Sequence, residues 1–561
     1  MNKNVTRGLA SLALATALAA GTSSCVKDLD HDPPLNSITT DQIFRDPAIY
    51  KSILAKLYAG LNITGQSATG QADISADDEG QTAYSRLVWK LQELTTDEAV
   101  VAWSDGAIQD LNHNTWTSTN NFIQFMYARI YLEVGLCNEY LRETTDAKLS
   151  SRSITGADAD KARAYRAEAR FLRALAYLQG VDFFGGVPIT TESDPVGYFY
   201  PEQKSRTEVF NYVESELKAI ENELPDPNDA SKFEYGRASK GAAQALLARM
   251  YLNAEVYTGS PKYTECVTYC NKVMAWPNYA LASNYRNLFR ADNNVTSASE
   301  IIFAITQDGL RSRTYGGTTF LVHAAVSGTP RTTQLKGPDQ GIGTGWGGIR
   351  ARKPLPLLFG DSASVIANTI ADQRSFFSTT RVTLGQNTIT DIGDFNKGIT
   401  VRKWSNLTSG GAAGSDPGGT FVDTDIPFLR LGDVYLMYAE AIARGGAGGD
   451  AATALQRIND LRQRAYKDAN GVMQNYPGDI ATYDLDFLFA ERSREMYWEG
   501  TRRTDLIRFG KYTGGAYNWP FKGSNATINR NGMAIPDHLK LFPIPASELT
   551  ANPKVRQNPG Y

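Results

Sequence analysis

The chain of 561 residues is 42% hydrophobic and 21% charged, an ordinary globular composition with ample material for a large core. Its formal net charge of −3 gives no indication of nucleic acid or of an anionic membrane surface as a partner. Tyrosine is frequent, with 28 copies, and 8 tryptophans accompany it. Both side chains combine an apolar body with a polar tip, which suits either core filling or a wet recognition surface.

The N-terminus has the pattern of an export signal. Lys3 and Arg7 precede an apolar run over residues 9–20, and the small residues 21–24 follow. This pattern predicts a secretory signal peptide over residues 1–24, which is too short to remain as a membrane span.

Cys25 comes directly after these small residues, as at the cleavage site of a bacterial lipoprotein, where the thiol is acylated. We therefore predict lipidation at Cys25 and an extended tether over residues 25–40, which contain Pro33 and Pro34. Thr22 stands where such sites usually have Leu, so a plain signal peptide followed by an incidental cysteine is the alternative. The acidic residues just after Cys25 resemble the tag that directs such lipoproteins to the cell surface.

Apolar residues then recur at helical spacing through most of the chain, and successive helices are joined by short links. The helices are expected at about 41–61, 84–94, 120–143, 163–184, 207–223, 239–256, 262–274, 433–444, 450–464, 484–499 and 504–509. Pairs of this kind cannot cover their own apolar faces and must stack, as in tetratricopeptide repeats, although no strict 34-residue period is present. The segment 103–116 is expected to be irregular.

The helix beginning near Arg163 is the element around which the others are expected to pack. Its apolar residues cover most of the circumference, which requires neighbouring helices on more than one side. A narrow stripe of arginines at helical spacing remains, at positions 163, 166, 170 and 173. We interpret this stripe as a solvated or ion-paired edge rather than a phosphate site. Gly185, Gly186 and Pro188 end the helix.

Between about 300 and 425 the composition changes. Residues 301–305 are strand-like, and Gly, Ser, Thr and Pro become dense. Loops of this kind are where function concentrates. The segment 343–348 fits a G-x-G-x-x-G pattern, but no strand precedes it and two prolines follow, so a dinucleotide site is rejected.

Three aromatic residues lie in glycine-rich or polar loop settings: Trp103, Tyr315 and Trp346. Small neighbours leave a ring face open, and open aromatic faces stack on the apolar faces of sugar rings. Asp78 and Arg86 could supply hydrogen bonds to sugar hydroxyls. For each residue alone, ordinary packing or a surface role is the competing interpretation.

No catalytic motif is present, although a pair of facing carboxylates for glycoside hydrolysis is not excluded by 60 acidic residues. Asp292 lies in a loop that weakly suggests structural calcium. No cofactor is expected. The odd number of cysteines after Cys25, at positions 137, 266 and 270, argues against a disulfide framework and favours buried thiols. A strained bridge between Cys266 and Cys270 is the weaker alternative.

Several segments resemble the SusD/RagB family of outer-membrane lipoproteins of Bacteroidetes, nearly from end to end. The most specific is Glu491 to Gly510, ERSREMYWEGTRRTDLIRFG, and others are AEARFLRALAY from Ala167 and DFFGGVP from Asp182. The match is closest to the starch-binding branch. That resemblance implies stacking roles for Trp103, Tyr315 and Trp346, and polar sugar contacts for Asp78 and Arg86. A departure is Val101, where that branch has a second Trp, and loops between about 350 and 420 differ in length.

The resemblance implies a mainly α-helical fold, a tetratricopeptide-like superhelix that supports a loop-rich binding face with a few short strands. It implies one domain over 41–561, with helical repeats at about 41–299 and 430–510 and a loop-rich insert at about 300–425. The expected protein is a non-catalytic, lipid-anchored outer-membrane protein facing the exterior. It would capture starch-like α-glucan or maltooligosaccharide for a SusC-like TonB-dependent transporter. The alternatives are a binder of a different glycan, a structural lid without a strong sugar site, and a glycoside hydrolase.

Overall fold

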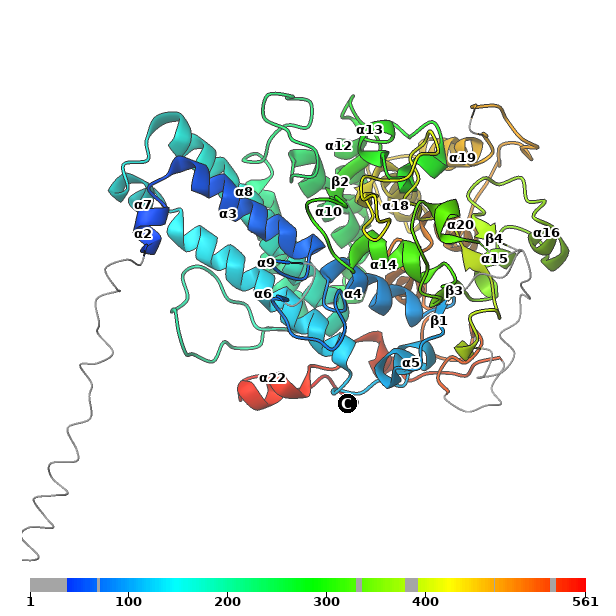
Figure 1. The fold of residues 1–561 in the computed structure, drawn as a ribbon, viewed down its shortest axis with the longest axis horizontal. Coiled ribbons are helices and arrows are strands. Elements are labelled where there is room, and N and C mark those ends of the chain that lie inside the picture. The colour runs from blue at the N-terminus through cyan, green and yellow to red at the C-terminus, as the bar shows by residue number, and fades with distance from the viewer. Residues whose placement is uncertain (1–37, 68–70, 329–334, 379–391, 469, 525–530) are drawn as a thin grey trace, which may run out of the picture.

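The computed structural model describes residues 38–67, 71–328, 335–378, 392–468, 470–524 and 531–561. The predicted signal peptide, Cys25 and most of the tether lie outside these ranges. The described chain is mainly helical, with three small two-stranded sheets, which confirms the predicted fold class (Figure 1). Within these ranges, no helix combines the length and the apolar character that crossing a bilayer would require.

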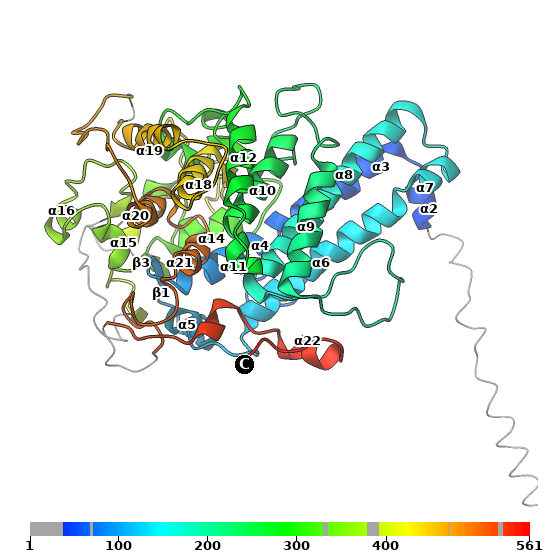
Figure 2. The same ribbon diagram turned by 180° about the vertical axis from the view of Figure 1, so that it is seen from behind.

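The helices of the first half form an antiparallel stack. They are α2 (Thr40–Ile43), α3 (Pro47–Asn62), α4 (Tyr84–Trp89), which continues as a π-helical turn over Lys90–Leu94, α5 (Gly106–His113), α6 (Asn121–Glu143), α7 (Asp146–Ser151), α8 (Gly156–Phe184), α9 (Arg206–Ile220), α10 (Lys240–Leu252), α11 (Ala254–Thr258) and α12 (Tyr263–Met274). Helix α8 packs on α3, α6 and α9, and α10 packs on α12. Figure 2 shows α12, α10 and α9 side by side, with α8 next to α9.

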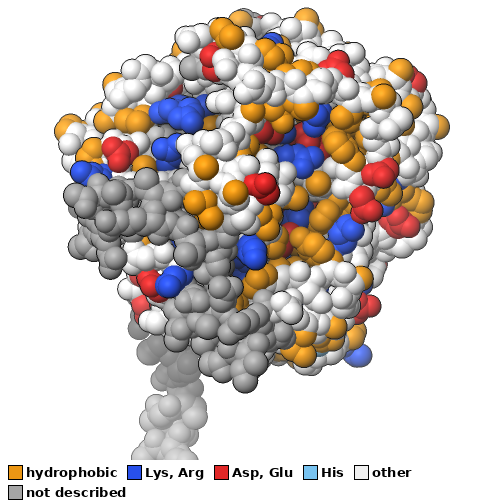
Figure 3. Space-filling view, turned by 90° about the vertical axis from the view of Figure 1, so that its right-hand side faces the viewer, with side chains coloured by type: hydrophobic (Ala, Val, Ile, Leu, Met, Phe, Trp, Pro, Cys, Tyr) orange, Lys and Arg blue, Asp and Glu red, His pale blue; other side chains and the backbone are white. Residues whose placement is uncertain are grey.

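The later helices are more widely spaced along the chain. They are α13 (Asn293–Thr296), α14 (Gly317–Ala324), α15 (Pro354–Leu357), α16 (Ser362–Ala367), α18 (Leu431–Ala443), α19 (Ala451–Ala465), α20 (Leu485–Met496), α21 (Arg502–Arg508) and α22 (Ala546–Ala551). Helix α18 packs on α12, α19 and α20, which joins the late helices to the early ones. On the face shown in Figure 3, basic and acidic side chains are interspersed among hydrophobic ones.

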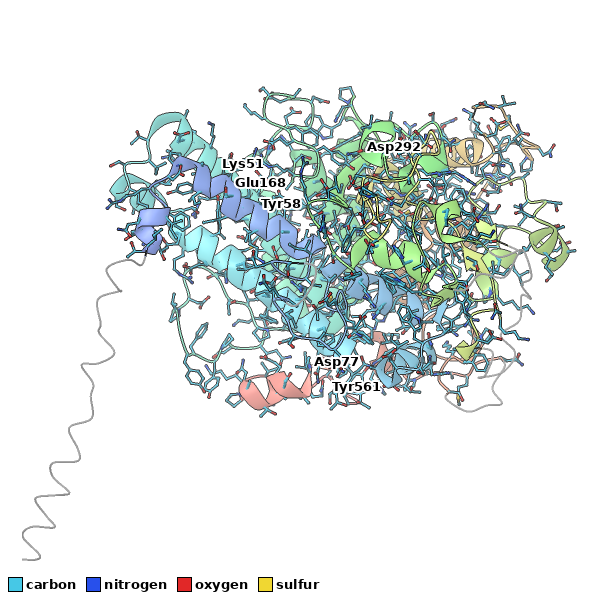
Figure 4. All side chains as sticks on the ribbon, in the orientation of Figure 1. Lys51, Tyr58, Asp77, Glu168, Asp292 and Tyr561 are labelled. Atoms are coloured by element: carbon cyan, nitrogen blue, oxygen red, sulfur yellow. The ribbon has the colours of Figure 1, made fainter. Side chains whose placement is uncertain are left out.

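The prediction of a sandwiched central helix is confirmed. Ala169, Phe171 and Leu172 of α8 are all buried although they lie on different sides of the helix. Its arginine stripe is an ion-paired edge, because Arg170 and Arg173 both bind Glu216, with N–O distances of 3.0 and 2.9 Å. Figure 4 shows the neighbouring contact between α3 and α8, where the hydroxyl of Tyr58 donates to Glu168 at 2.5 Å.

Two local predictions were wrong, and one buried helix was missed. The single helix expected over 41–61 is two helices, because the side chain of Asp46 caps a new helix that starts at Pro47. The segment 103–116, expected to be irregular, contains α5. The loop-rich region 300–425 contains α14, which is buried along its whole length. A helix buried on every side has no polar face, so it lacks the amphipathic signal that sequence reasoning depends on.

The strands pair residues that are distant in sequence. Strand β1 (Ala99–Val101) pairs antiparallel with β3 (Ile349–Ala351), with Val101 opposite Ile349. The predicted strand β2 (Ile301–Ile305) is confirmed and pairs with β6 (Ile426–Arg430), while β4 (Phe377–Ser378) pairs with β5 (Thr400–Val401). The first pair matters most for the site, because it brings the segments around residues 103 and 346 together.

Candidate functional site

One open cavity of about 680 Å³ brings the five predicted binding residues together: Asp78, Arg86, Trp103, Tyr315 and Trp346. It lies where α4, α5, α14 and the β1–β3 sheet meet. All three predicted aromatic residues are half-buried rather than enclosed. Side chains from four separate parts of the chain therefore share one surface.

The β1–β3 register positions the two tryptophans. Trp103 follows β1 and Trp346 precedes β3, and the backbone N–H of Ala102 donates to the carbonyl of Gly348 at 2.9 Å. The indole Nε1–H of Trp103 donates to the carbonyl of Trp346 at 3.4 Å. A Cβ at Gly348 would lie 2.6 Å from the Trp103 ring, so this glycine allows the indole to rest against the backbone.

Helix α14 connects all three aromatic residues. Tyr315 lies two residues before it, and Phe320 within it contacts the Trp103 ring, with 6.0 Å between ring centroids. At its C-terminal end, the carbonyls of His323 and Ala324 accept hydrogen bonds of 2.8 Å from the N–H groups of Trp346 and Gly348. The helix is thus the common support of the three rings.

The rings of Tyr315 and Trp346 lie next to each other and are inclined. Their centroids are 6.3 Å apart and their planes make an angle of 48°. The back of the Trp346 indole is covered by His323, at a centroid distance of 4.7 Å and an angle of 23°. The back of Tyr315 is near Phe421, 5.1 Å away. Together the two rings form a bent platform rather than a flat one.

Arg86 and Asp78 differ in exposure. The side chain of Arg86 is 3% exposed and that of Asp78 is 60% exposed, with an N–O distance of 3.4 Å between them. The guanidinium of Arg86 also donates to the carbonyls of Glu79 and Tyr315, at 3.3 Å each, and lies over the ring of Phe320. Burial lowers the pKa of Arg86 to about 10, so it stays charged near neutral pH. Much of its hydrogen-bonding capacity is used within the protein.

Sequence reasoning missed several residues of the cavity, namely Asp77, Glu79, Gln81, Asp105 and Ile108. Asp77 and Glu79 flank the predicted Asp78, but nothing in their local pattern distinguished them from other surface acids. Asp105 stands at the N-cap of α5 and makes no side-chain capping bond. The acidic character of the cavity wall emerges only when these two loops meet.

The structure also places the cysteines and Asp292. Cys137, Cys266 and Cys270 are free and buried, so the thiol interpretation is confirmed and the alternative bridge is wrong. The side chain of Asp292 accepts hydrogen bonds from the N–H and hydroxyl of Ser409, and it anchors that loop. Figure 4 shows Asp292 near the upper edge of the molecule, far from Asp77 near the lower edge. Among the described residues, no group of three or more His, Cys, Asp or Glu is placed to hold a metal ion.

Comparison with known proteins identifies the family. The SusD family model matches residues 377–561, and a family described as starch-binding and associating with the outer membrane matches residues 52–252. The chain is 33% identical to the starch-binding protein SusD of Bacteroides thetaiotaomicron, with all of both chains covered. It is 24% identical to the SusD-like protein P25 of Formosa agariphila, covering 96% of this chain and 97% of that one. The chain belongs to the SusD/RagB family.

Solved structures agree with the fold. A surface glycan-binding protein A from Bacteroides fluxus superposes with a TM-score of 0.66 at 20% identity, over 92% of this chain and 99% of that one. A laminarin-binding SusD-like protein superposes with a TM-score of 0.64 at 22% identity, over 92% and 99%. At these identities the likeness concerns the fold alone.

Proposed function

We propose that this protein is a cell-surface glycan-binding lipoprotein that captures starch-like α-glucan or maltooligosaccharide. It binds the glycan without changing it chemically and passes it to a SusC-like TonB-dependent transporter. The observation that supports this most directly is the open cavity in which Trp103, Tyr315 and Trp346 meet beside polar side chains. Aromatic faces next to hydrogen-bonding groups are what a sugar ring, with apolar faces and a polar edge, requires.

The bend of the platform favours a curved glucan. Tyr315 and Trp346 are adjacent but inclined by 48°, so consecutive sugar rings stacked on them would also be inclined. An α-1,4-glucan curves in this way in solution, whereas a flat chain would have to bend. A rigid platform that matches the shape of the free ligand avoids the cost of reorganising it.

The comparisons support the proposal at the level of glycan binding. The full-length relative at 33% identity is named a starch-binding protein. Two similar structures are instead named for the binding of laminarin or for a complex with laminarihexaose. The alternative is therefore a SusD-like binder of a different glucan, or a structural lid of the transporter that has no strong sugar site.

The membrane anchor and the partner are part of the same proposal. A family model described as associating with the outer membrane matches residues 52–252, and Cys25 follows the predicted export signal. Acylation of Cys25 would hold the binding domain at the outer membrane, facing the cell exterior, next to a transporter. A mature protein with a mass increment on Cys25 would support the anchor, and copurification of a TonB-dependent transporter would support the partner.

Binding of a glucan panel tests the site. Native protein is expected to bind maltoheptaose more tightly than laminarihexaose and cellohexaose in calorimetry. Trp346→Ala and Tyr315→Ala should each weaken binding of maltoheptaose by about tenfold, which corresponds to about 1.4 kcal/mol, because each removes one stacking face.

Tyr198→Ala is the matched control, since Tyr198 is 85% exposed and does not line the cavity. Its affinity should equal that of the native protein. Unchanged affinity in Trp346→Ala and Tyr315→Ala would show that the cavity is not the binding site. Shorter products after incubation with maltoheptaose would favour the glycoside hydrolase, and laminarihexaose bound tighter than maltoheptaose would favour the alternative glucan.

A further inference from the structure

The wall of the cavity has an excess of negative charge. Four carboxylates line it, from Asp77, Asp78, Glu79 and Asp105, whereas among the described residues of the lining Arg86 is the one basic side chain. The guanidinium of Arg86 is buried and lies 3.4 Å from a carboxylate oxygen of Asp78. This single positive charge is therefore already matched by one of the four negative charges.

The carboxylates come from two loops at the edge of the platform. Asp77, Asp78 and Glu79 belong to the loop before α4, and Asp105 stands at the start of α5, two residues after Trp103. Asp77, Asp78 and Asp105 are exposed, so water rather than protein surrounds most of each carboxylate. A glycan that stacks on the aromatic residues would lie within a Debye length, about 8 Å at physiological salt, of these charges.

We propose that this carboxylate rim, formed by Asp77, Glu79 and Asp105 together with Asp78, restricts the site to uncharged glycans and excludes polysaccharides with carboxylate or sulfate groups. The inference rests on the proposed function. Hydroxyl groups of a neutral sugar can donate hydrogen bonds to carboxylates, and charge-assisted bonds of this kind are strong. An anionic substituent at the same place meets repulsion, and the described residues that line the cavity offer it no unmatched cation.

Chemically matched polysaccharides test the rim. Amylose and laminarin are each used in three forms, which are unmodified, hydroxyethylated and carboxymethylated to the same degree. The hydroxyethyl group has nearly the size of the carboxymethyl group but no charge, so it separates steric from electrostatic effects. We expect affinity electrophoresis at low salt to show similar retention on the first two forms and at least tenfold weaker retention on the third. In 1 M NaCl, where the Debye length is about 3 Å, the difference in retention between the hydroxyethylated and carboxymethylated forms should shrink.

A variant identifies the charges responsible. Asp77→Asn, Glu79→Gln and Asp105→Asn are combined, while Asp78 is kept because it is a predicted sugar contact. We expect this triple variant to bind the carboxymethylated glucan about tenfold better than native protein does. Its affinity for the unmodified glucan should not rise and should fall by about twofold to fivefold, because neutral amides accept weaker hydrogen bonds from sugar hydroxyls than carboxylates do.

The control variant makes the same change in net charge away from the cavity. Asp158→Asn, Glu202→Gln and Glu223→Gln replace exposed carboxylates that do not line it, and this variant should behave as the native protein does. Equal retention of native protein on carboxymethylated and hydroxyethylated glucan would overturn the selectivity while leaving glycan binding in place. No retention on any form of either glucan would contradict the proposed glycan site and therefore the proposed selectivity as well.

Discussion

The imidazole of His323 lies flat behind the indole of Trp346 and leaves only the opposite indole face open to the cavity. His323 is buried, and its Nδ1–H donates to the carbonyl of Thr344 at 2.6 Å, which fixes the imidazole ring. Burial lowers the pKa of His323, so the ring is neutral near pH 7 and acts as an aromatic plate. The orientation of the stacking surface therefore depends on a residue that does not line the cavity.

His323→Ala should weaken glucan binding by about tenfold, because the indole of Trp346 loses its backing and gains freedom to rotate. His323→Phe keeps a flat ring and should restore most of the affinity, although both variants lose the bond to Thr344. Calorimetry measures the glucan affinity of each variant, and chemical denaturation measures its stability. Equal affinity losses in the two variants would show that the effect is general destabilisation rather than positioning.

Single residues also show where sequence reasoning reaches its limit. Trp103, Tyr315 and Trp346 could be singled out because their small or polar neighbours leave a ring face open, which is a local property. Arg86 was predicted to be a sugar contact, but its burial and its bonds to Glu79 and Tyr315 depend on loops from elsewhere in the chain. Such contacts cannot be predicted from the local sequence.

At the scale of elements, α14 and the β1–β3 sheet hold the site together. Gly348, just before β3, leaves room for the indole of Trp103, since a Cβ there would lie 2.6 Å from that ring. A second glycine, Gly135, lies on the exposed side of α6, where an added Cβ would meet nothing within 4 Å. The same substitution at these two positions should have opposite effects.

Gly348→Ala should displace the Trp103 indole and reduce glucan affinity by about tenfold, with some loss of stability. Gly135→Ala should raise the free energy of unfolding by about 0.5–1 kcal/mol, because alanine loses less backbone entropy than glycine in a helix. Its glucan affinity should not change. Chemical denaturation measures the stability of both variants, and calorimetry measures their glucan affinity. If Gly348→Ala bound glucan as tightly as the native protein does, Gly348 would not be needed to position Trp103.

At the scale of the whole molecule, buried ion pairs join the late helices to the core. The family signature over residues 491–510 supplies many of the charges. The buried network consists of Glu300, Arg374, Lys403, Arg430, Arg464, Glu491, Glu495 and Glu499. A second group links Asp433 of α18 to Arg249 and Arg492, with N–O distances of 2.9 and 3.1 Å. Removing one partner leaves a buried charge unpaired, which typically costs about 3–5 kcal/mol.

These pairs predict how stability depends on pH. Burial would raise the pKa of Asp433, but the charges of Arg492 and Arg249 outweigh it and lower the pKa to about 2. Burial acts on Glu491 in the same way, and Arg374 and Arg494 lower its pKa to about 2. In the unfolded chain these groups titrate near pH 4. Because the folded pKa values are lower, their contribution is present above about pH 4 and is lost as the pH falls toward 2.

Unfolding by denaturant should therefore show a marked fall in stability between about pH 5 and pH 2. Asp433→Asn should be less stable than the native protein at neutral pH, and its stability should fall less steeply with acid because one of the depressed carboxyls is gone. A native stability that stays constant from pH 6 to pH 3 would contradict the assignment of these carboxyls as ion-paired and stabilising.

The amino-acid pattern alone determined the helical class, the approximate extent of most helices, the sandwiched position of α8, strand β2 and the three aromatic residues of the candidate site. Helix signals depend on neighbours three and four residues apart, so a single segment contains them. Tertiary structure decided the rest. The register of β1 on β3, the buried helix α14, the burial of Arg86 and the meeting of Asp77 and Asp105 at one rim depend on contacts between segments that are far apart in the chain. Such contacts form only when the whole molecule packs, so the spacing of residues within one segment cannot predict them.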